Sequence, residues 1–256
     1  MSSLRIPGDR NLTYGLVESL GRSIVSGKFD SNSFPTEGEL ASQHGTSRSV
    51  TREAVKMLTA KGLLRARPRQ GTSVTSESHW NLLDPDVLRW LLERKFSLSL
   101  LKEFTEMRLA IEPAAVALAA ARVDAGTLAR IEASLERMKA ADRGEGDTVE
   151  ADIAFHTALL GASGNRFFAN LDQLVNTALR ISIRFTNSIK GRSASIPQHE
   201  EVLDAVRARD PERASAAMRL LILDVLALVS AAAPGNGNGN SNSNGSAKAR
   251  VSRRRA

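Results

Sequence analysis

Apolar residues recur at helical spacing from near the start of the chain. Leu12, Leu16, Leu20 and Ile24 stand four residues apart, which predicts a helix with one buried stripe. Gly27 follows them, and glycine is favoured just past the C-terminus of a helix. The first element of the fold is therefore expected to be an amphipathic helix that ends at this glycine.

Capping residues predict two more helices. Thr36, with Glu39 three positions later, is typical of a capping box, and the helix that it opens should end at Gly45. Ser47 is the expected N-cap of a third helix, which should stop before Gly62. The apolar face of this third helix consists of Val50, Ala54, Val55 and Leu58.

A short hairpin is expected after the third helix. Residues 63–67 and 72–74 have the pattern of two strands, and the basic, glycine-containing segment 68–71 has the composition of a turn. The order of elements is then helix, helix, turn, helix and wing. We predict a winged helix-turn-helix.

Beyond residue 80 no segment has the alternating pattern of a strand. Apolar positions instead follow the helical period, and the breaks between them are short. Short connections join antiparallel neighbours, so the predicted fold is mainly α, with an N-terminal winged helix-turn-helix and a C-terminal all-α antiparallel helical bundle. The helices are expected at about 84–95, 98–122, 126–142, 148–161, 166–189, 197–208 and 211–232.

Four segments follow from this pattern. Residues 1–76 should form the DNA-binding domain, and residues 77–97 a linker with a connecting helix. Residues 98–233 should form an all-helical domain, to which the family resemblance given below assigns effector binding and dimerisation. Residues 234–256 are dominated by Gly, Asn and Ser with a terminal Arg cluster, which predicts a disordered basic tail.

Charge and composition narrow the function. The net charge of +7 is concentrated at the two ends, with about +5 in residues 1–75 and +5 in residues 234–256, as expected for an end domain that meets a phosphate backbone. The chain has no cysteine, which excludes disulfides and thiolate metal sites and suits a reducing cytoplasm. We expect neither a signal peptide nor a membrane span, because Asp224 interrupts the longest apolar run.

Residues 34–74 resemble the winged helix-turn-helix of the GntR family of bacterial regulators. The rest of the chain resembles the FadR branch of this family, whose C-terminal helical FCD domain binds effectors. Residues 79–90 are most similar to the repressors of galactonate and related sugar-acid operons. The resemblance is carried by Pro35, Glu37, Leu40, Ala41, Gly45, Ser47, Arg48, Arg52, Glu53, Ala54, Leu58, Gly62, Leu63, Gly71, Thr72 and Val74.

This resemblance implies contacts with double-stranded operator DNA. A recognition helix presents its N-terminal end to the major groove, and Arg48 and Arg52, four residues apart, project from one face of the predicted third helix. Arg is the side chain best shaped for the two acceptors of guanine. The alternative is an ordinary solvated helix face. The implied DNA-binding residues are Ser47, Arg48, Ser49, Arg52, Gln70 and Gly71.

Two positions depart from the family pattern. Gly38 stands where the family usually has Arg, so one phosphate or base contact should be missing and the operator or the affinity should differ. Thr51 stands where an apolar residue is usual, which should weaken the local core slightly.

A candidate metal site lies in the predicted bundle. Asp152 and His156 are one helical turn apart on one face, a spacing that can chelate a cation, although such a pair is more often only hydrogen-bonded. With His199, these residues resemble the ligands that hold a divalent metal in the effector domain of the FadR branch. A further His of metal-binding members is replaced here by Leu221. The resemblance implies Zn, with Ni or Mn also suited to N and O ligands.

Arg108 is the remaining candidate for effector binding. It matches an Arg of the same domain that helps bind the carboxylate of the effector, and a guanidinium can hold a carboxylate with two parallel hydrogen bonds. The alternative is a structural salt bridge with Glu112 or Glu106. Together with Asp152, His156 and His199, Arg108 makes up the implied site for a small carboxylate.

Three functions remain to be compared. The first is a cytoplasmic, homodimeric regulator, a repressor that a sugar acid releases from its operator, with no enzymatic activity. The second is a metal-dependent hydrolase that uses the Asp and His cluster, against which stands the lack of a general base beside the ligands. The third is a DNA-binding protein that responds to no ligand.

Overall fold

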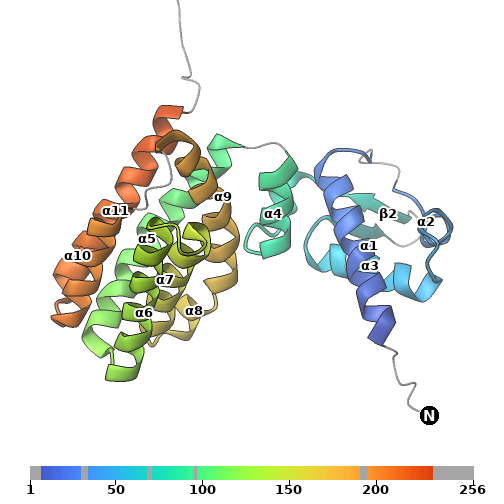
Figure 1. Ribbon diagram of the computed structural model, residues 1–256. Coiled ribbons are helices and arrows are strands. Elements are labelled where there is room, and N and C mark those ends of the chain that lie inside the picture. The colour runs from blue at the N-terminus through green and yellow to red at the C-terminus, as the bar shows by residue number, and fades with distance from the viewer. Residues whose placement is uncertain (1–6, 30–33, 68–70, 95–96, 191–194, 233–256) are drawn as a thin grey trace, which may run out of the picture.

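The computed structural model describes residues 7–29, 34–67, 71–94, 97–190 and 195–232. Figure 1 shows two parts joined by one helix: an N-terminal part that contains the only sheet of the described residues, and a C-terminal part built from helices. This is the mainly α architecture that the sequence predicts. The N-terminal elements are α1 (Pro7–Val25), α2 (Glu37–His44), α3 (Arg48–Ala60), β1 (Leu64–Arg67), β2 (Gly71–Val74) and η1 (Glu77–His79), followed by α4 (Pro85–Arg94).

The stripe along α1 forms one wall of the N-terminal core. Leu16, Leu20 and Ile24 are buried as expected, whereas Leu12, on the same stripe, is 55% exposed. The prediction was wrong for Leu12 because the cluster that the stripe joins begins one turn later, at Leu16. The core is completed by α2, α3 and the first strand.

The predicted caps and hairpin are present. The Thr36 side chain accepts a hydrogen bond from the Glu39 N–H, and the Glu39 carboxylate accepts one from the Thr36 N–H, so the capping box is complete. Strands β1 and β2 pair antiparallel, from Leu64 opposite Val74 to Arg67 opposite Gly71. The turn residues 68–70 lie outside the described residues.

Gly62 fixes the exit from α3. Its φ is +82°, and a Cβ built on it would lie 2.2 Å from the carbonyl oxygen of His79. A side chain is therefore excluded twice, by backbone strain and by the close approach of the segment that leads to α4. This glycine sets how the chain returns from the hairpin toward the first helix.

Helix α4 packs on both parts of the molecule. Val87, Trp90 and Leu91 belong to the N-terminal core cluster, while Leu88 and Leu92 pack in a cluster with α9. The two sets alternate at helical spacing, so opposite faces of one short helix serve two cores. Lys61, at the end of α3, holds the start of this helix through Asp84 at 2.7 Å and Asp86 at 2.9 Å.

The C-terminal part is a helical bundle around α5. This helix contacts α7, α9, α10 and α11. Within its alanine-rich segment, Ala115, Val116, Ala119 and Ala120 are buried, and such small side chains let neighbouring helices approach closely. The elements of the C-terminal part are α5 (Leu98–Arg122), α6 (Ala125–Asp142), α7 (Thr148–Ala162), α8 (Arg166–Ala169), α9 (Asp172–Lys190), α10 (Ile196–Arg207) and α11 (Pro211–Ala232).

One predicted helix is divided in two. The segment 166–189 was expected to be continuous, but α8 ends at Ala169 and α9 begins at Asp172. Asn170 caps the short first helix, and the N–H of Leu171 bonds back to the carbonyl of Phe168, which closes a turn. Asparagine favours such local turns over helix interiors, which the apolar spacing alone does not reveal.

Helix α11 is long and apolar enough to cross a membrane by length and composition, and no other described helix is. Core helices of folded domains pass the same test. Its buried face, which includes Met218 and Ile222, packs in the bundle against α5 and α10. We therefore interpret α11 as a core helix.

Candidate functional site

The N-terminus of α3 presents the predicted DNA-contacting serines. Ser47 caps this helix, since its Oγ accepts a hydrogen bond from the Val50 N–H at 3.3 Å. The same Oγ lies 2.8 Å from the Oγ of Ser49. Both serines and Arg48 are exposed, so the first turn of α3 offers hydroxyl and guanidinium groups to the solvent.

Arg52 lies one turn further along the same surface and is held by α2. Its Nε donates to Glu37 Oε2 at 3.1 Å, while its side chain remains 61% exposed. The two terminal nitrogens of the guanidinium have no partner among the described residues. Glu37 thereby fixes one edge of Arg52 and leaves the other free, a contact between helices that the sequence analysis missed.

The two departures from the family pattern have different local consequences. A Cβ on Gly38 would lie 4.0 Å from Arg48 Nη2 and from Thr36 Oγ1, so the first carbon of a side chain fits there without a clash. Thr51 is fully buried, but its hydroxyl bonds the Ser47 carbonyl at 3.2 Å. The buried hydroxyl is therefore satisfied, which limits the cost expected from the sequence.

The wing is described only in part. Gly71 opens β2 with a φ of +80°, a conformation in which glycine carries no strain. Gln70, the other residue predicted at the wing tip, lies outside the described residues.

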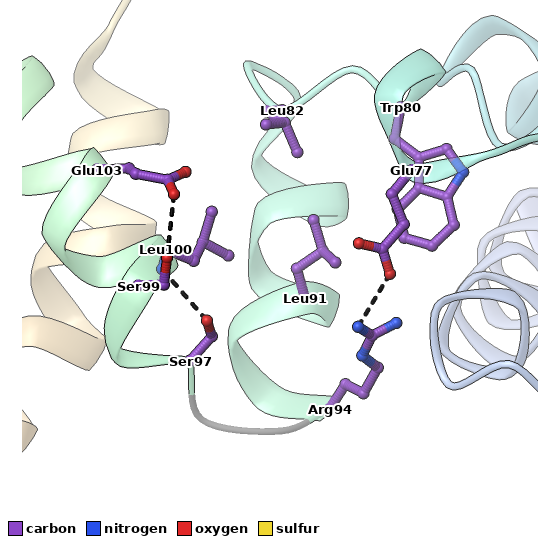
Figure 2. Close-up of a pocket in the computed structure, with 9 residues that line it drawn as sticks. All are labelled: Glu77, Trp80, Leu82, Leu91, Arg94, Ser97, Ser99, Leu100 and Glu103. Carbon is purple, nitrogen blue, oxygen red and sulfur yellow. Dashed lines mark hydrogen bonds and ion pairs between the residues drawn. The ribbon is translucent and has the colours of Figure 1, made fainter. Parts of the chain in front are cut away.

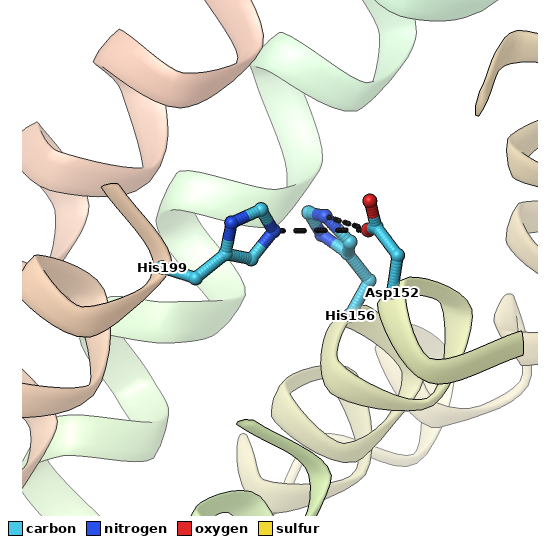
Figure 3. Close-up of side chains that lie close together, drawn as sticks. All are labelled: Asp152, His156 and His199. Carbon is cyan, nitrogen blue, oxygen red and sulfur yellow. Dashed lines mark ion pairs between the residues drawn. The ribbon is translucent and has the colours of Figure 1, made fainter. Parts of the chain in front are cut away.

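Inside the bundle, the three predicted metal ligands lie together (Figure 3). Asp152 and His156 come from α7 and His199 from α10. Asp152 Oδ1 is 3.3 Å from His156 Nε2 and 3.7 Å from His199 Nε2. All three side chains are buried, and one ligand atom from each lies within 4.8 Å of the others.

Two buried atoms of this cluster lack a hydrogen-bond partner among the described residues: Asp152 Oδ1 and His199 Nε2. The Nδ1 of His199 lies 2.9 Å from the Ser195 carbonyl and donates to it, so Nε2 is the ring nitrogen left for another partner. A buried unpaired acceptor is costly unless something binds there. A divalent cation fits this carboxylate and imidazole set.

Glu112 positions the second histidine. Its Oε2 lies 2.6 Å from His156 Nδ1 and accepts a hydrogen bond from that N–H, which leaves Nε2 facing Asp152. Burial raises the pKa of Glu112, but the charges of Arg108 and His156 outweigh it and hold that pKa at about 2. Glu112 is thus an anion inside the bundle. From the sequence, Glu112 was expected only as a possible salt-bridge partner of Arg108.

The ionisation of the cluster follows from its contacts. Burial lowers the pKa of His156, but the facing Glu112 and Asp152 more than offset this and the pKa is raised. Burial raises the pKa of Asp152, but the neighbouring imidazoles of His156 and His199 lower it well below its usual range. Asp152 is therefore a carboxylate in the folded protein, the form that binds a cation.

Arg108 forms a salt bridge with Glu112, which was the alternative to effector binding, and it also lines the cavity. Its Nε donates to Glu112 Oε1 at 2.5 Å, and Nη2 lies 3.3 Å from Oε2 of the same residue. Nη1 has no partner among the described residues. Glu106, the other possible partner, pairs with Lys102 at 3.7 Å instead. The free side of the guanidinium remains available to an anion in the cavity.

The cavity beside these groups has a volume of about 80 Å³ and lies between helices of the bundle. Leu221, at the position where a further His was considered, is 5% exposed and forms part of the wall. The described residues therefore offer three protein ligands. The lining residues are Arg108, Asp152, His156, Leu179, Ser182, Ile183, Thr186, Ser195, Gln198, His199, Leu221, Asp224, Val225 and Leu228.

A second, larger cavity of about 440 Å³ lies where α4 meets α5 (Figure 2). Arg94 there donates to Glu77 at 3.0 Å and to the Val25 carbonyl, and Ser99 donates to Glu103 at 3.1 Å. Arg94 and Glu77 are thus paired with each other, and Glu103 with the Ser99 hydroxyl. None of the predicted DNA, effector or metal residues lines it.

Two family models match the chain. Residues 12–74 match the bacterial regulatory proteins of the GntR family, and residues 103–224 match the FCD domain. The helix-turn-helix with its hairpin falls in the first match, and all three candidate metal ligands fall in the second.

Curated relatives match most of the chain. The galactonate operon transcriptional repressor of Escherichia coli K12 is 34% identical over 217 residues, which are 83% of this chain and 94% of the relative. An HTH-type transcriptional regulator of the same organism, YieP, is 31% identical over 225 residues, 87% of this chain and 97% of the relative. These relatives are transcription regulators and not enzymes.

A solved structure supports the fold. The Lar protein, which controls the agr system of Listeria monocytogenes, aligns with a TM-score of 0.56 at 18% identity, over 90% of this chain and 100% of that chain. At this identity the likeness concerns the fold alone.

Proposed function

The chain belongs to the GntR family of bacterial transcription regulators and carries its FCD effector domain, and from this premise we propose that it is a cytoplasmic repressor which a small carboxylate releases from its operator. DNA binding and a response to a small molecule follow from the family. The effector class, the bound metal, the contact residues and the homodimer are proposals.

The observation that carries the proposal is the pair of unpartnered buried atoms at the cavity, Asp152 Oδ1 and His199 Nε2. With His156 they would hold a divalent metal ion, which we propose to be Zn²⁺, since two imidazoles and a carboxylate suit it. A bound metal would supply positive charge and open coordination positions for effector oxygens. Arg108, on the cavity wall, would hold the effector carboxylate through its free nitrogen.

We infer that the effector is a sugar acid similar to galactonate. The galactonate operon repressor is among the relatives, and the cavity combines a cationic side with hydroxyl and amide groups. The acid would bind best in one arrangement of the bundle and so change the placement of the DNA-binding part. The path runs through α4, which packs on both parts.

The first turn of α3 and the wing would contact DNA. Ser47 and Ser49 suit phosphates, and Arg48 and Arg52 suit base edges or nearby phosphates. Gln70 and Gly71 would reach the minor groove from the wing. Two such modules reading two half-sites are the usual geometry, so we propose a homodimer, which sedimentation of the full chain in solution checks.

The test is release from the operator. DNA from the region upstream of the gene is bound by the full chain with Zn²⁺, and galactonate is titrated in. His156→Ala and Arg108→Ala should keep operator affinity but lose release, because neither touches α3; Glu106→Ala, on the exposed face of α5, is the control.

Three results would contradict parts of this scheme. Release of both variants at the same galactonate concentration as the unmodified protein would place the effector elsewhere. Operator affinity that no acid alters would favour a DNA-binding protein without a ligand. Loss of DNA binding itself in His156→Ala would mean that the cluster is needed for folding and not for sensing.

A further inference from the structure

One face of α9 and one face of α11 line the cavity, with residues at the same spacing on both helices. On α11 the lining residues are Leu221, Asp224, Val225 and Leu228, with spacing of three, four and seven residues. On α9 they are Leu179, Ser182, Ile183 and Thr186, with the same spacing. Each helix thus shows the cavity one face. Asp224 is the one charged residue of the α11 stripe.

Burial separates an inner end of the cavity from its mouth. Arg108, His156 and His199 are at most 3% exposed and form the inner end together with Asp152. Asp224 and Ser195 are exposed, and Gln198 and Thr186 are half-buried, so these four lie at the mouth. The inner end offers a guanidinium and the metal ligands, whereas the mouth offers hydroxyl, amide and carboxylate groups.

A hydrogen bond between two helices organises the mouth. Gln198 Nε2, on α10, donates to Asp224 Oδ2, on α11, at 2.7 Å. With the described residues, Asp224 Oδ1 and Gln198 Oε1 make no hydrogen bond. Among the described residues, two oriented acceptors are therefore free beside the cavity. Gln198 precedes His199 of the inner end, and Asp224 is one turn from Leu221, which lines the cavity wall.

We propose that Asp224 and Gln198 are specificity-determining residues that accept hydrogen bonds from the distal hydroxyls of a polyhydroxylated acid. This inference rests on the proposed function, because it takes the carboxylate to be at the inner end. A carboxylate accepts hydrogen bonds only, so Asp224 selects ligand groups that donate and repels a second anionic group. A short hydroxy acid that ends in a methyl group does not reach the mouth.

The same geometry explains why Asp224 is placed on an otherwise apolar stripe. Leu221, Val225 and Leu228 can contact the carbon chain of the ligand, while a donor that meets Asp224 forms a charge-assisted bond, stronger than a neutral one. A site that hydrogen-bonds a hydroxyl rejects an analogue lacking it, because its polar groups are left unpaired.

The test compares two probes on the full chain loaded with one equivalent of Zn²⁺. Titration calorimetry measures the affinities for galactonate, which carries hydroxyls along its whole chain, and for lactate. The unmodified protein should prefer galactonate by at least about tenfold, the size of one good hydrogen bond. Asp224→Leu and Gln198→Leu should each lower the galactonate affinity roughly tenfold and leave the lactate affinity unchanged.

Controls separate specificity from folding. Asp204→Leu changes an exposed aspartate on the solvent side of α10 and should alter neither affinity. Zn²⁺ affinity, measured by chelator competition, should be unchanged in the Asp224 and Gln198 variants. A merely structural role would lower galactonate, lactate and Zn²⁺ binding together.

Each other outcome overturns the inference. Equal galactonate affinity in the unmodified protein and both variants removes Asp224 and Gln198 from recognition while the proposed function stands. Tighter binding of lactate, with release from the operator, retains a carboxylate-responsive repressor but rejects a hydroxyl-selective mouth. Binding of neither acid defeats the proposed sugar-acid effector and this inference together.

Discussion

Single hydrogen bonds decide what the buried histidines can do. Nδ1 of His199 is taken by the Ser195 carbonyl and Nδ1 of His156 by Glu112, so the Nε2 atoms of both rings point toward the Asp152 carboxylate. Partners of this kind fix the ring orientation of metal-binding histidines and raise their basicity. Glu112 is therefore a positioning residue.

This role gives a first prediction. Glu112→Gln should lower Zn²⁺ affinity roughly ten- to a hundredfold, because His156 loses the anion that orients it. Chelator competition measures the affinity, and thermal unfolding checks that the variant folds despite the loss of a partner for Arg108. Glu106→Gln, on the exposed face of the same helix, should bind Zn²⁺ normally. Unchanged affinity in a folded Glu112→Gln protein would show that the contact is only structural.

A second prediction concerns the recognition helix. Arg48→Ala and Arg52→Ala should each weaken specific operator binding by about 1–3 kcal/mol, since each guanidinium can contact a base edge or phosphate. Both side chains are exposed, so the free energy of unfolding should change little. Operator affinity at one fixed salt concentration is the measurement. If both variants bind like the unmodified protein, α3 does not read the operator.

The sequence predicts the ligands of the candidate site better than their environment. Asp152 and His156 share one helix, so their spacing alone brings them together. The contact of Glu112 with His156 depends on how α5 packs against α7, and that of Gln198 with Asp224 on how α10 packs against α11. No local pattern carries this information. For the same reason Leu12 was expected in the core that begins at Leu16.

At the scale of elements, the packing of α1 against α4 depends on Gly21, which has no side chain. A Cβ on Gly21 would lie 2.3 Å from the ring of Trp90, which is itself buried. Gly21→Ala should therefore destabilise the protein by about 1–3 kcal/mol through overpacking. Gly15, on the same helix, has nothing within 4 Å, so Gly15→Ala should be neutral or slightly stabilising. Denaturant unfolding of both variants makes the comparison.

The contact between α1 and α4 should also make the free energy of unfolding depend on pH. Arg89, Arg22 and Trp90 donate to Glu18 and, despite some burial, hold its pKa at about 2, below the ordinary value of 4.5. Because the folded pKa is depressed, this contribution is present above pH 4.5 and is lost as the pH falls toward 2. The carboxylate is partly exposed, so solvent screening limits the effect to roughly 1 kcal/mol.

Glu18→Gln isolates this contribution. The variant should be less stable at neutral pH, and its free energy of unfolding should fall less steeply than that of the unmodified protein between pH 4.5 and 2. Denaturant unfolding at several pH values measures both slopes. Parallel slopes would assign the acid sensitivity to other carboxylates.

At the scale of the whole molecule, α4 should carry the coupling between effector and operator. By thermodynamic linkage, the effector lowers the affinity for the operator by the same factor by which the operator lowers the affinity for the effector. Leu92→Ala removes a buried contact with α9 and should reduce that factor at least about threefold, because small changes at packed interfaces shift coupling by up to about 2 kcal/mol. Leu83→Ala, at a side chain that is 62% exposed, is the control. The two affinities, each measured with and without the other ligand, give the factor.

One helix that belongs to two cores also restricts how such regulators can be recombined. A chimera that joins residues 1–76 to a foreign effector domain would lack Val87 and Trp90, and the core of the N-terminal part would lose these buried side chains. A splice at residues 95–96 keeps that core but carries Leu88 and Leu92 into a foreign bundle. Exchange of effector domains between paralogues should therefore succeed only where the incoming domain has a recess for these two leucines on the helix that corresponds to α9. Fusion proteins without this recess should bind DNA but should not respond to the effector.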